Sequence, residues 1–475
     1  MLFNSFAFAV FLPLVFICYW ALQRRSLRAQ NVLLLVASYF FYGCWDWRFL
    51  GLIAFSSAVD YVIGIKLDAT EKSASRKRWL LISVAVNLGV LGFFKYYGFF
   101  VESLAEGMES LGIQANLPTL RIILPVGISF YTFQSLSYTI DIYRRQIRPT
   151  HDALAFFTFV SFFPQLVAGP IERASHLLPQ FLSPRHFDTG LAKDGLRQIL
   201  WGLFKKIVIA DNLAGLVENI FVNYKDYDAS VLFLGTLYFA IQIYCDFSGY
   251  SDIAIGTARL FGFDLMRNFA YPYFSRDIGE FWRRWHISLS TWFRDYVYIP
   301  LGGSQGVSRW HHFSVLLITF VISGFWHGAN WTFIVWGLLN GLFYLPLVVS
   351  NKHKRHQEIV AQGRWLPSLR ETFQISMTFA FTLMAWVFFR ADSLTHAVDY
   401  LTRMTTAGWS SPQMIRGIPY VTVLLIAEWI QREKPHTLSI ASAPVFVRWT
   451  IYYCVIGAIF LFGKTGHVPF IYFQF

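Results

Sequence analysis

Charged residues are scarce in this sequence. Asp, Glu, Lys and Arg make up 14% of the 475 residues, against about 25% in an average soluble domain. Hydrophobic residues make up 55%, which is too many for a soluble protein that must keep a polar surface. Apolar stretches long enough to cross ~30 Å of hydrocarbon recur from end to end. This composition excludes an ordinary soluble enzyme and predicts a protein embedded in the lipid bilayer.

Cysteine is also rare. The four cysteines are far apart in the sequence, and each lies in or beside an apolar segment: Cys18, Cys44, Cys245 and Cys454. None of them has the pair spacing of a zinc or redox motif. We therefore expect them to be packing residues, and we expect no metal site and no permanently bound cofactor.

The sequence has no long soluble domain, no Gly/Ser linker, no low-complexity tract and no repeat of solenoid period. We therefore expect a single integral membrane domain covering residues 1–475. The first apolar segment, 3–22, has no basic residue before it and no small-x-small site after it, so we expect a first span rather than a cleaved signal. The net charge of +12 comes from short basic clusters between apolar runs. That distribution is typical of membrane loops, and no nucleic-acid partner is expected.

The apolar runs predict an all-α, polytopic fold. Several runs are too short or too long for one clean crossing, so we expect roughly ten to twelve crossings together with re-entrant and interfacial helices. The predicted spans are 3–22, 31–45, 48–66, 79–101, 121–141, 154–170, 197–222, 229–262, 314–346, 372–390, 418–430 and 447–463.

Basic residues between the early spans predict an orientation. Arg24, Arg25 and Arg28 follow the first span, so this loop is expected on the cytoplasmic side. The loop that carries Glu102 and Glu106 has no basic residue and is expected outside. We therefore expect the amino terminus on the outer side of a bacterial inner membrane.

A histidine lies inside the longest apolar run, 313–350. The run contains Gly-Phe-Trp-His-Gly-Ala-Asn-Trp at 324–331. It exceeds the ~20 residues of one crossing and falls short of two, which predicts two broken or tilted segments meeting around Gly324 to Gly328. Irregular backbone at that depth is tolerated only where protein or a cavity satisfies it, and an ionisable side chain there is costly unless it is used or paired.

His327 is therefore a candidate catalytic residue, and Trp326 and Asn330 are candidates for its support. The alternative is structural, since a neutral imidazole can join two membrane helices by hydrogen bonds. The pattern leaves both interpretations open, although the neighbouring glycines and Asn330 favour the functional one.

A second histidine lies in an Arg- and Trp-rich stretch at 280–303. Helical spacing places Trp282, His286 and Leu289 on one face, as in an amphipathic helix at the membrane interface. Interface anchoring explains the tryptophans and arginines. A functional alternative is that the arginines hold the phosphates of a thioester donor, and the candidates are Arg283, Arg284 and Arg294.

Two carboxylates occur in the apolar stretch at 244–256. Asp246 and Asp252 need partners at such a position, and we expect them to pair with arginines or to cap broken helices rather than to catalyse.

Taken together, these stretches resemble the membrane-bound O-acyltransferase (MBOAT) family, and within it the bacterial branch of alginate O-acetyltransferase membrane components. The resemblance covers nearly the whole chain. Its motifs are Met-Leu-Phe-Asn-Ser at 1–5, Ala-Gly-Pro-Ile-Glu-Arg at 168–173, Cys-Asp-Phe-Ser-Gly-Tyr-Ser-Asp at 245–252, Trp-His-Ile-Ser-Leu-Ser at 285–290, Trp-His-Gly at 326–328 and Pro-Phe-Ile-Tyr-Phe-Gln-Phe at 469–475.

The resemblance implies that His327 is the essential catalytic histidine and that His286 is the second motif histidine. It implies an MBOAT fold whose helices surround a thin central site, between a cytoplasmic donor entrance and an outward-facing acceptor funnel. The implied reaction moves an acetyl group, most simply from acetyl-CoA, to an exopolysaccharide such as alginate or to a periplasmic partner protein that passes it on. Other acceptors of the same kind are peptidoglycan and cellulose.

Other activities remain open on the sequence alone. D-alanylation of teichoic acid is a rival within the enzyme class. A non-enzymatic transporter or scaffold would also be polytopic, but the paired internal repeats usual in transporters are not evident.

Overall fold

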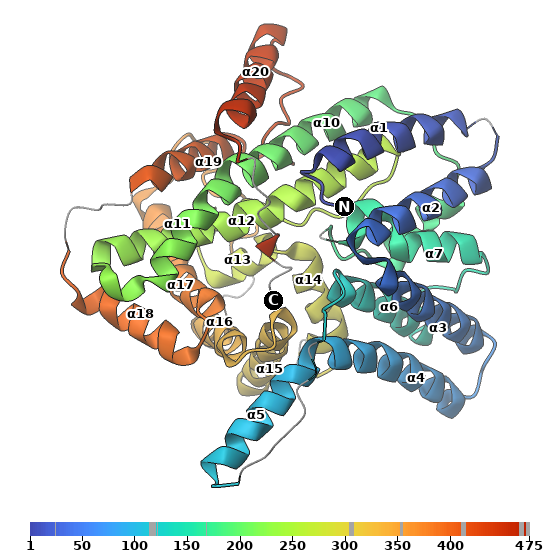
Figure 1. The fold of residues 1–475 in the computed structure, drawn as a ribbon, viewed down its shortest axis with the longest axis horizontal. Helices are drawn as coiled ribbons and strands as arrows, with labels where there is room; N and C mark the ends of the chain where they lie inside the picture. The colour runs from blue at the N-terminus through green and yellow to red at the C-terminus, as the bar shows by residue number, and fades with distance from the viewer. Residues whose placement is uncertain are drawn as a thin grey trace. The chain divides into compact units, whose positions relative to one another are not determined.

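The computed structural model describes residues 1–23, 25–113, 120, 122–167, 169–303, 308–351, 355–409, 415–464 and 470–471. In this part of the chain all regular secondary structure is helical (Figure 1), which confirms the predicted all-α fold. Of the positions named above, Arg24, Ala168, Pro469 and 472–475 lie outside the described residues.

The first of two compact units consists of Met1–Gly195 and Thr257–Met266. In it α3 packs against α4 and α6, and α2 packs against α7. Its helices are α1 (Phe6–Ala21), α2 (Leu27–Asp46), η1 (Trp47–Phe49), α3 (Leu50–Asp68), α4 (Ser73–Leu91), η2 (Gly92–Tyr96), α5 (Tyr97–Ser110), α6 (Ile128–Tyr143), α7 (Ala153–Ser161), α8 (Phe163–Leu166) and α9 (Ala174–Leu182).

The second unit consists of Leu196–Gly256 and Arg267–Phe475. Its main packing is between α15 and α16 and between α16 and α17. The helices with all or most of their residues here are α10 (Thr189–Leu203), η3 (Phe204–Ala210), α11 (Asp211–Val222), η4 (Tyr224–Asp226), α12 (Ala229–Leu260), η5 (Pro272–Phe274), α13 (Ile278–Arg284), α14 (Ile287–Phe293), η6 (Arg294–Tyr298), α15 (Arg309–His327), α16 (Trp331–Val349), α17 (Leu369–Arg390), α18 (Leu394–Thr406), η7 (Ile415–Gly417), α19 (Ile418–Ile430) and α20 (Val445–Phe462). The expectation of one domain from 1 to 475 stays a prediction.

Short polar side chains start several of the apolar helices. Ser5 accepts a hydrogen bond from a first-turn N–H of α1, and Ser26 and Ser308 do the same for α2 and α15. At α17 Ser368 and Glu371 form a reciprocal capping box. These caps satisfy N–H groups that have no partner within the helix, a need that is acute where little water is present.

Six helical stretches of the described chain are long and apolar enough to cross a membrane. They confirm a multi-pass membrane protein. The other predicted spans fall mostly on shorter helices, such as α1 and α6 with 16 residues each and α19 with 13. The six stretches are Leu27–Asp68, Ser73–Ser110, Ala229–Leu260, Trp331–Val349, Leu369–Arg390 and Val445–Phe462.

Candidate active site

The long uncharged run folds as a helical hairpin of α15 and α16, with the turn at Gly328–Asn330. The prediction of two segments that meet near Gly328 is confirmed. The backbones of the two helices touch: a Cβ added at Gly324 would lie 2.2 Å from the carbonyl oxygen of Phe333, and one at Gly337 would lie 2.3 Å from that of Phe320. Only glycine fits at such a contact, and close backbone packing of this kind is typical of membrane helix pairs.

His327 is the last residue of α15 and is 4% exposed. Three aromatic rings surround its imidazole at steep angles. The ring centroids of Trp326 and Trp336 lie 5.0 Å away, and that of Phe389 on α17 lies 5.5 Å away. These rings exclude bulk water from the imidazole and fix its position.

Asn330 caps the second helix of the hairpin. Its side-chain oxygen accepts a hydrogen bond from Thr332 N at 3.0 Å, and its side-chain nitrogen donates to the carbonyl oxygen of Asp392 at 3.1 Å. Asn330 therefore holds the start of α16 next to the turn that follows His327.

His286 lies at a break between α13 and α14, so the expected continuous helix with Trp282, His286 and Leu289 on one face is wrong. The backbone of His286 is left-handed, with φ of 42°. The reason is Asn268. Its backbone oxygen accepts from Ile287 N at 2.9 Å, and its side-chain oxygen accepts from Ser288 N and Ser288 Oγ at 3.3 and 3.0 Å. These bonds replace the helical partners that α14 lacks at its start.

The His286 side chain is fixed by the same asparagine. Its Nδ1 lies 3.0 Å from Asn268 Oδ1, and a carbonyl oxygen can only accept, so the proton is on Nδ1. The ring stands at 87° to Phe247, with the centroids 4.6 Å apart. Burial lowers the pKa of His286 to about 3, which keeps the imidazole neutral near pH 7.

Trp326 brings the two histidines into one site. Its ring centroid lies 5.0 Å from that of His327 and 6.4 Å from that of His286. The sequence-predicted pair is therefore joined through a single indole ring.

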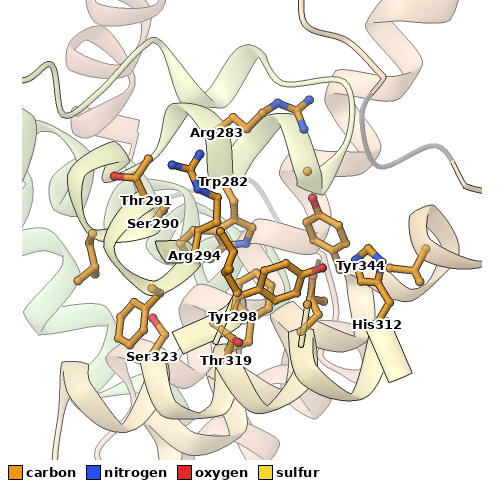
Figure 2. A pocket seen from close by; sticks show the side chains of 18 of the residues that line it. Trp282, Arg283, Ser290, Thr291, Arg294, Tyr298, His312, Thr319, Ser323 and Tyr344 are labelled. Atoms are coloured by element: carbon orange, nitrogen blue, oxygen red, sulfur yellow. The ribbon is translucent and has the colours of Figure 1, made fainter. Parts of the chain in front are cut away.

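A cavity of about 1190 Å³ is lined by Ile287 and Ser323, while His286, Trp326 and His327 do not line it. It exceeds the ~300–1,000 Å³ of ordinary ligand pockets. Figure 2 shows Arg283 and Arg294 toward one side of it and Thr319 and Ser323 toward the opposite side. Ser323 precedes His327 by four residues on α15, so both lie on the same helix face. The cavity thus extends to within one helical turn of His327.

The cavity is positively charged. Arg283, Arg294 and Arg309 line it, and its described lining contains no Asp or Glu. Arg283 donates to the backbone oxygen of Arg355 at 2.7 Å, and Arg294 forms a 2.7 Å ion pair with Asp295.

Arg284, the third predicted phosphate ligand, does not line the cavity. It forms a 2.7 Å ion pair with the buried Glu280, on the same helix. The charge of Glu280 needs a partner inside the protein and Arg284 supplies it, while a phosphate-binding role of Arg284 stays a prediction.

Asp246 and Asp252 belong to a buried charge network. Asp246 forms a 2.7 Å ion pair with Lys206 and accepts a 2.7 Å hydrogen bond from Ile471 N. Asp252 forms a 2.7 Å ion pair with Lys205. The partners are lysines rather than the expected arginines, and support of the site by the two aspartates stays a prediction.

Asn268, Lys205 and Lys206 were not predicted from the sequence. Lys205 and Lys206 lie inside the predicted span 197–222, and an ionisable pair in an apolar span is a signal that buried partners exist. Asn268 lies in the irregular connection after α12, where no periodicity points to it.

A model of the membrane-bound O-acyltransferase family matches residues 120–389, more than half of the chain. A probable alginate O-acetylase of Azotobacter vinelandii is 42% identical over 408 residues, which is 86% of this chain and 77% of the relative. A probable alginate O-acetylase of Pseudomonas putida is 36% identical over 504 aligned residues and 99% of both chains. The peptidoglycan O-acetyltransferase of Helicobacter pylori is 36% identical over 437 residues, 85% of this chain and 80% of the relative.

The enzymatic interpretation is thus confirmed over a non-enzymatic transporter or scaffold. The tightly packed hairpin, the two histidines and the basic cavity are parts of a membrane-embedded O-acetyltransferase, and the chain belongs to the membrane-bound O-acyltransferase family.

Proposed function

We propose that this enzyme moves an acetyl group from acetyl-CoA to a hydroxyl group, with His327 as the general base. The observation that carries the proposal is the position of His327: it ends a rigid hairpin helix whose same face lines a large basic cavity one turn earlier. A base, a sheltered site and an entrance for an anionic donor are thereby combined in one unit of the chain.

The cavity suits a donor with phosphate groups at one end and a small thioester at the other. Arg283 and Arg294 are exposed on one side of the cavity and can contact phosphates, with Arg309 as a further cation. Guanidinium groups bind phosphate through paired hydrogen bonds. The acetyl end would then lie toward Ser323, the lining residue on the His327 face.

The chemical step needs one proton acceptor. The neutral imidazole of His327 takes the proton of the acceptor hydroxyl as its oxygen attacks the thioester carbonyl carbon. The C–O bond forms, the C–S bond breaks, and the thiolate leaves and takes up a proton. General base catalysis of this kind contributes about 10² to 10⁴ in rate. His286 positions the site through Trp326 rather than moving the proton.

An exopolysaccharide such as alginate is the proposed final acceptor, either directly or through a periplasmic acetyltransferase partner. The names of the Azotobacter and Pseudomonas relatives support this choice. Peptidoglycan is the second candidate because of the Helicobacter relative. The orientation we propose has the amino terminus outside an inner membrane, with exposed Arg25 and Arg28 on the cytoplasmic side.

The test is complementation of a strain that lacks its own copy of this protein. The wild type should restore acetyl esters on the exopolysaccharide, and His327→Ala should leave fewer than about one in a hundred of them. A matched control is His151→Ala, because His151 is exposed in a loop of the other unit. All three proteins must be present in equal amounts in the membrane.

Unchanged acetylation by His327→Ala would refute the catalytic role. If the acetyl esters appeared on peptidoglycan instead of the exopolysaccharide, peptidoglycan would be the acceptor, and the proposed role of His327 would be unchanged. An assay of the purified protein with labelled acetyl-CoA would then show whether a variant has lost the use of the donor or the transfer to the acceptor.

A further inference from the structure

A small polar pocket lies in the first unit, where α1 ends and α2 begins. Its volume is about 250 Å³. The loop between the two apolar helices is only five residues long, from Leu22 to Ser26, which puts the pocket at a membrane–water interface. The lining residues are Gln23, Leu27, Gln30, Pro184, Arg185 and His186.

Arg185 is the charged group of this pocket and is 6% exposed. Its guanidinium donates to Asn31 Oδ1 at 2.7 Å and to the backbone oxygen of Gln180 at 2.9 Å. It also lies 4.8, 5.6 and 6.0 Å from the ring centroids of Phe263, Tyr19 and Phe181. The buried Nε has no hydrogen-bond partner, and in the described part of the chain no carboxylate forms an ion pair with Arg185. Neutral acceptors and aromatic rings stabilise this buried cation without neutralising its charge, so an anion at this place adds stability.

The pocket is built by hydrogen bonds rather than left by loose packing. Gln23 Nε2 donates to the backbone oxygen of Arg185 at 3.3 Å, and Gln30 Nε2 donates to that of Tyr19 at 3.2 Å. Leu27 is the first residue of α2, so the positive end of that helix adds to the potential here, although Ser26 already caps its Ala29 N–H.

The surrounding charge is positive. Arg25 and Arg28 are exposed on the same loop and first turn, and no acidic residue precedes Asp46 in the sequence. The carboxylate of the nearby Asp188 already accepts hydrogen bonds from Gly190 N and Leu191 N, at 2.6 and 3.0 Å.

Exposed apolar side chains begin beside the pocket on both helices. On each helix they recur every three or four residues, which makes a stripe along one face that suits acyl chains. The α1 stripe is Phe6, Val10, Leu14 and Ile17, and the α2 stripe is Val32, Val36 and Phe40.

We infer that this pocket binds the phosphate headgroup of an anionic phospholipid whose acyl chains lie along α1 and α2. The inference does not depend on the proposed function. A buried arginine, a helix amino terminus and two exposed apolar stripes are the chemistry that a lipid phosphate requires, whereas a free phosphate would make no use of the stripes.

The experiment is native mass spectrometry of the purified full-length protein with equal amounts of phosphatidylglycerol and phosphatidylcholine. The wild type should retain phosphatidylglycerol preferentially. Gln23→Glu is nearly isosteric and places a carboxylate beside Arg185, so we expect retention to fall about fivefold, the effect of one interfacial charge. His186→Glu, on an exposed residue, should act in the same direction and guards against a folding defect in the first variant.

The matched control is Gln146→Glu, the same charge change at an exposed glutamine of the same unit. It should retain phosphatidylglycerol as the wild type does. Equal loss in the control, or no headgroup preference in the wild type, would overturn the inference. Displacement of the lipid by an equal concentration of inorganic phosphate would assign the pocket to free phosphate instead.

Discussion

The two histidines of the candidate active site are both buried and both contact Trp326, yet they are held by different means. His286 lies at a helix break, with a left-handed backbone and a side-chain hydrogen bond to Asn268. His327 ends a regular helix and is enclosed by aromatic rings. A side chain fixed by a polar partner suits a positioning role, whereas one fixed by rings at the end of a rigid helix suits contact with a substrate.

The largest expected effect is on the rate of acetyl transfer, and it should differ between variants of the two histidines. His327→Gln should lower the rate of acetyl transfer about 10² to 10⁴-fold, because the amide cannot accept the hydroxyl proton. His286→Gln should lose less, because the glutamine amide can still donate to Asn268. Initial rates with labelled acetyl-CoA in proteoliposomes measure both, at equal protein. Equal losses of rate in the two variants would contradict the different roles proposed here and would indicate that His286 also takes part in the chemical step.

A smaller effect is expected on thermal stability when the hydrogen-bond partner of His286 is removed. Asn268→Leu removes the side-chain acceptor of Ser288 N, Ser288 Oγ and His286 Nδ1, and each buried group left unsatisfied costs about 1–3 kcal/mol. We expect a lower Tm in detergent by thermal unfolding. Gln362→Leu, at an exposed amide side chain of the same unit, is the control and should change Tm little. A Tm equal to the wild type for Asn268→Leu would show that Asn268 does not hold the break.

The smallest effect is expected on the free energy of unfolding when the helix cap next to His327 is removed. Asn330→Ala removes the cap of α16 and should cost about 1 kcal/mol of unfolding free energy. Asn330→Asp keeps an acceptor at the cap and should cost less. Denaturant unfolding of the two variants measures the difference. If both variants unfold alike, the bond to Asp392 rather than the cap is what stabilises the turn.

The hairpin was predictable because its signal is local. An apolar run too long for one crossing, with glycines near its middle, indicates a break near Gly328, and the structure turns there. The multi-pass helical fold follows from composition in the same way. The catalytic assignment of His327 stays a prediction from the sequence and from the family.

The break at His286 was not predictable, because its cause lies 18 residues away at Asn268. Helical spacing alone favours a continuous helix across Trp285 and His286, and only the hydrogen bonds of Asn268 interrupt it. Arg284 shows the same difficulty. The sequence gives no reason to distinguish Arg284 from the neighbouring Arg283, and only the structure shows that Arg284 pairs with the buried Glu280.

The backbone contact at Gly324 and Gly337 has a consequence for motion during turnover. Two helices whose main chains touch cannot slide or rotate separately without losing the contact, so we expect the hairpin to move as one body. Its tip carries His327 at a fixed place. In the proposed mechanism, donor and acceptor therefore travel to His327, and we expect the adjustments of turnover in the exposed arginine side chains of the cavity rather than in the helix that carries the histidine.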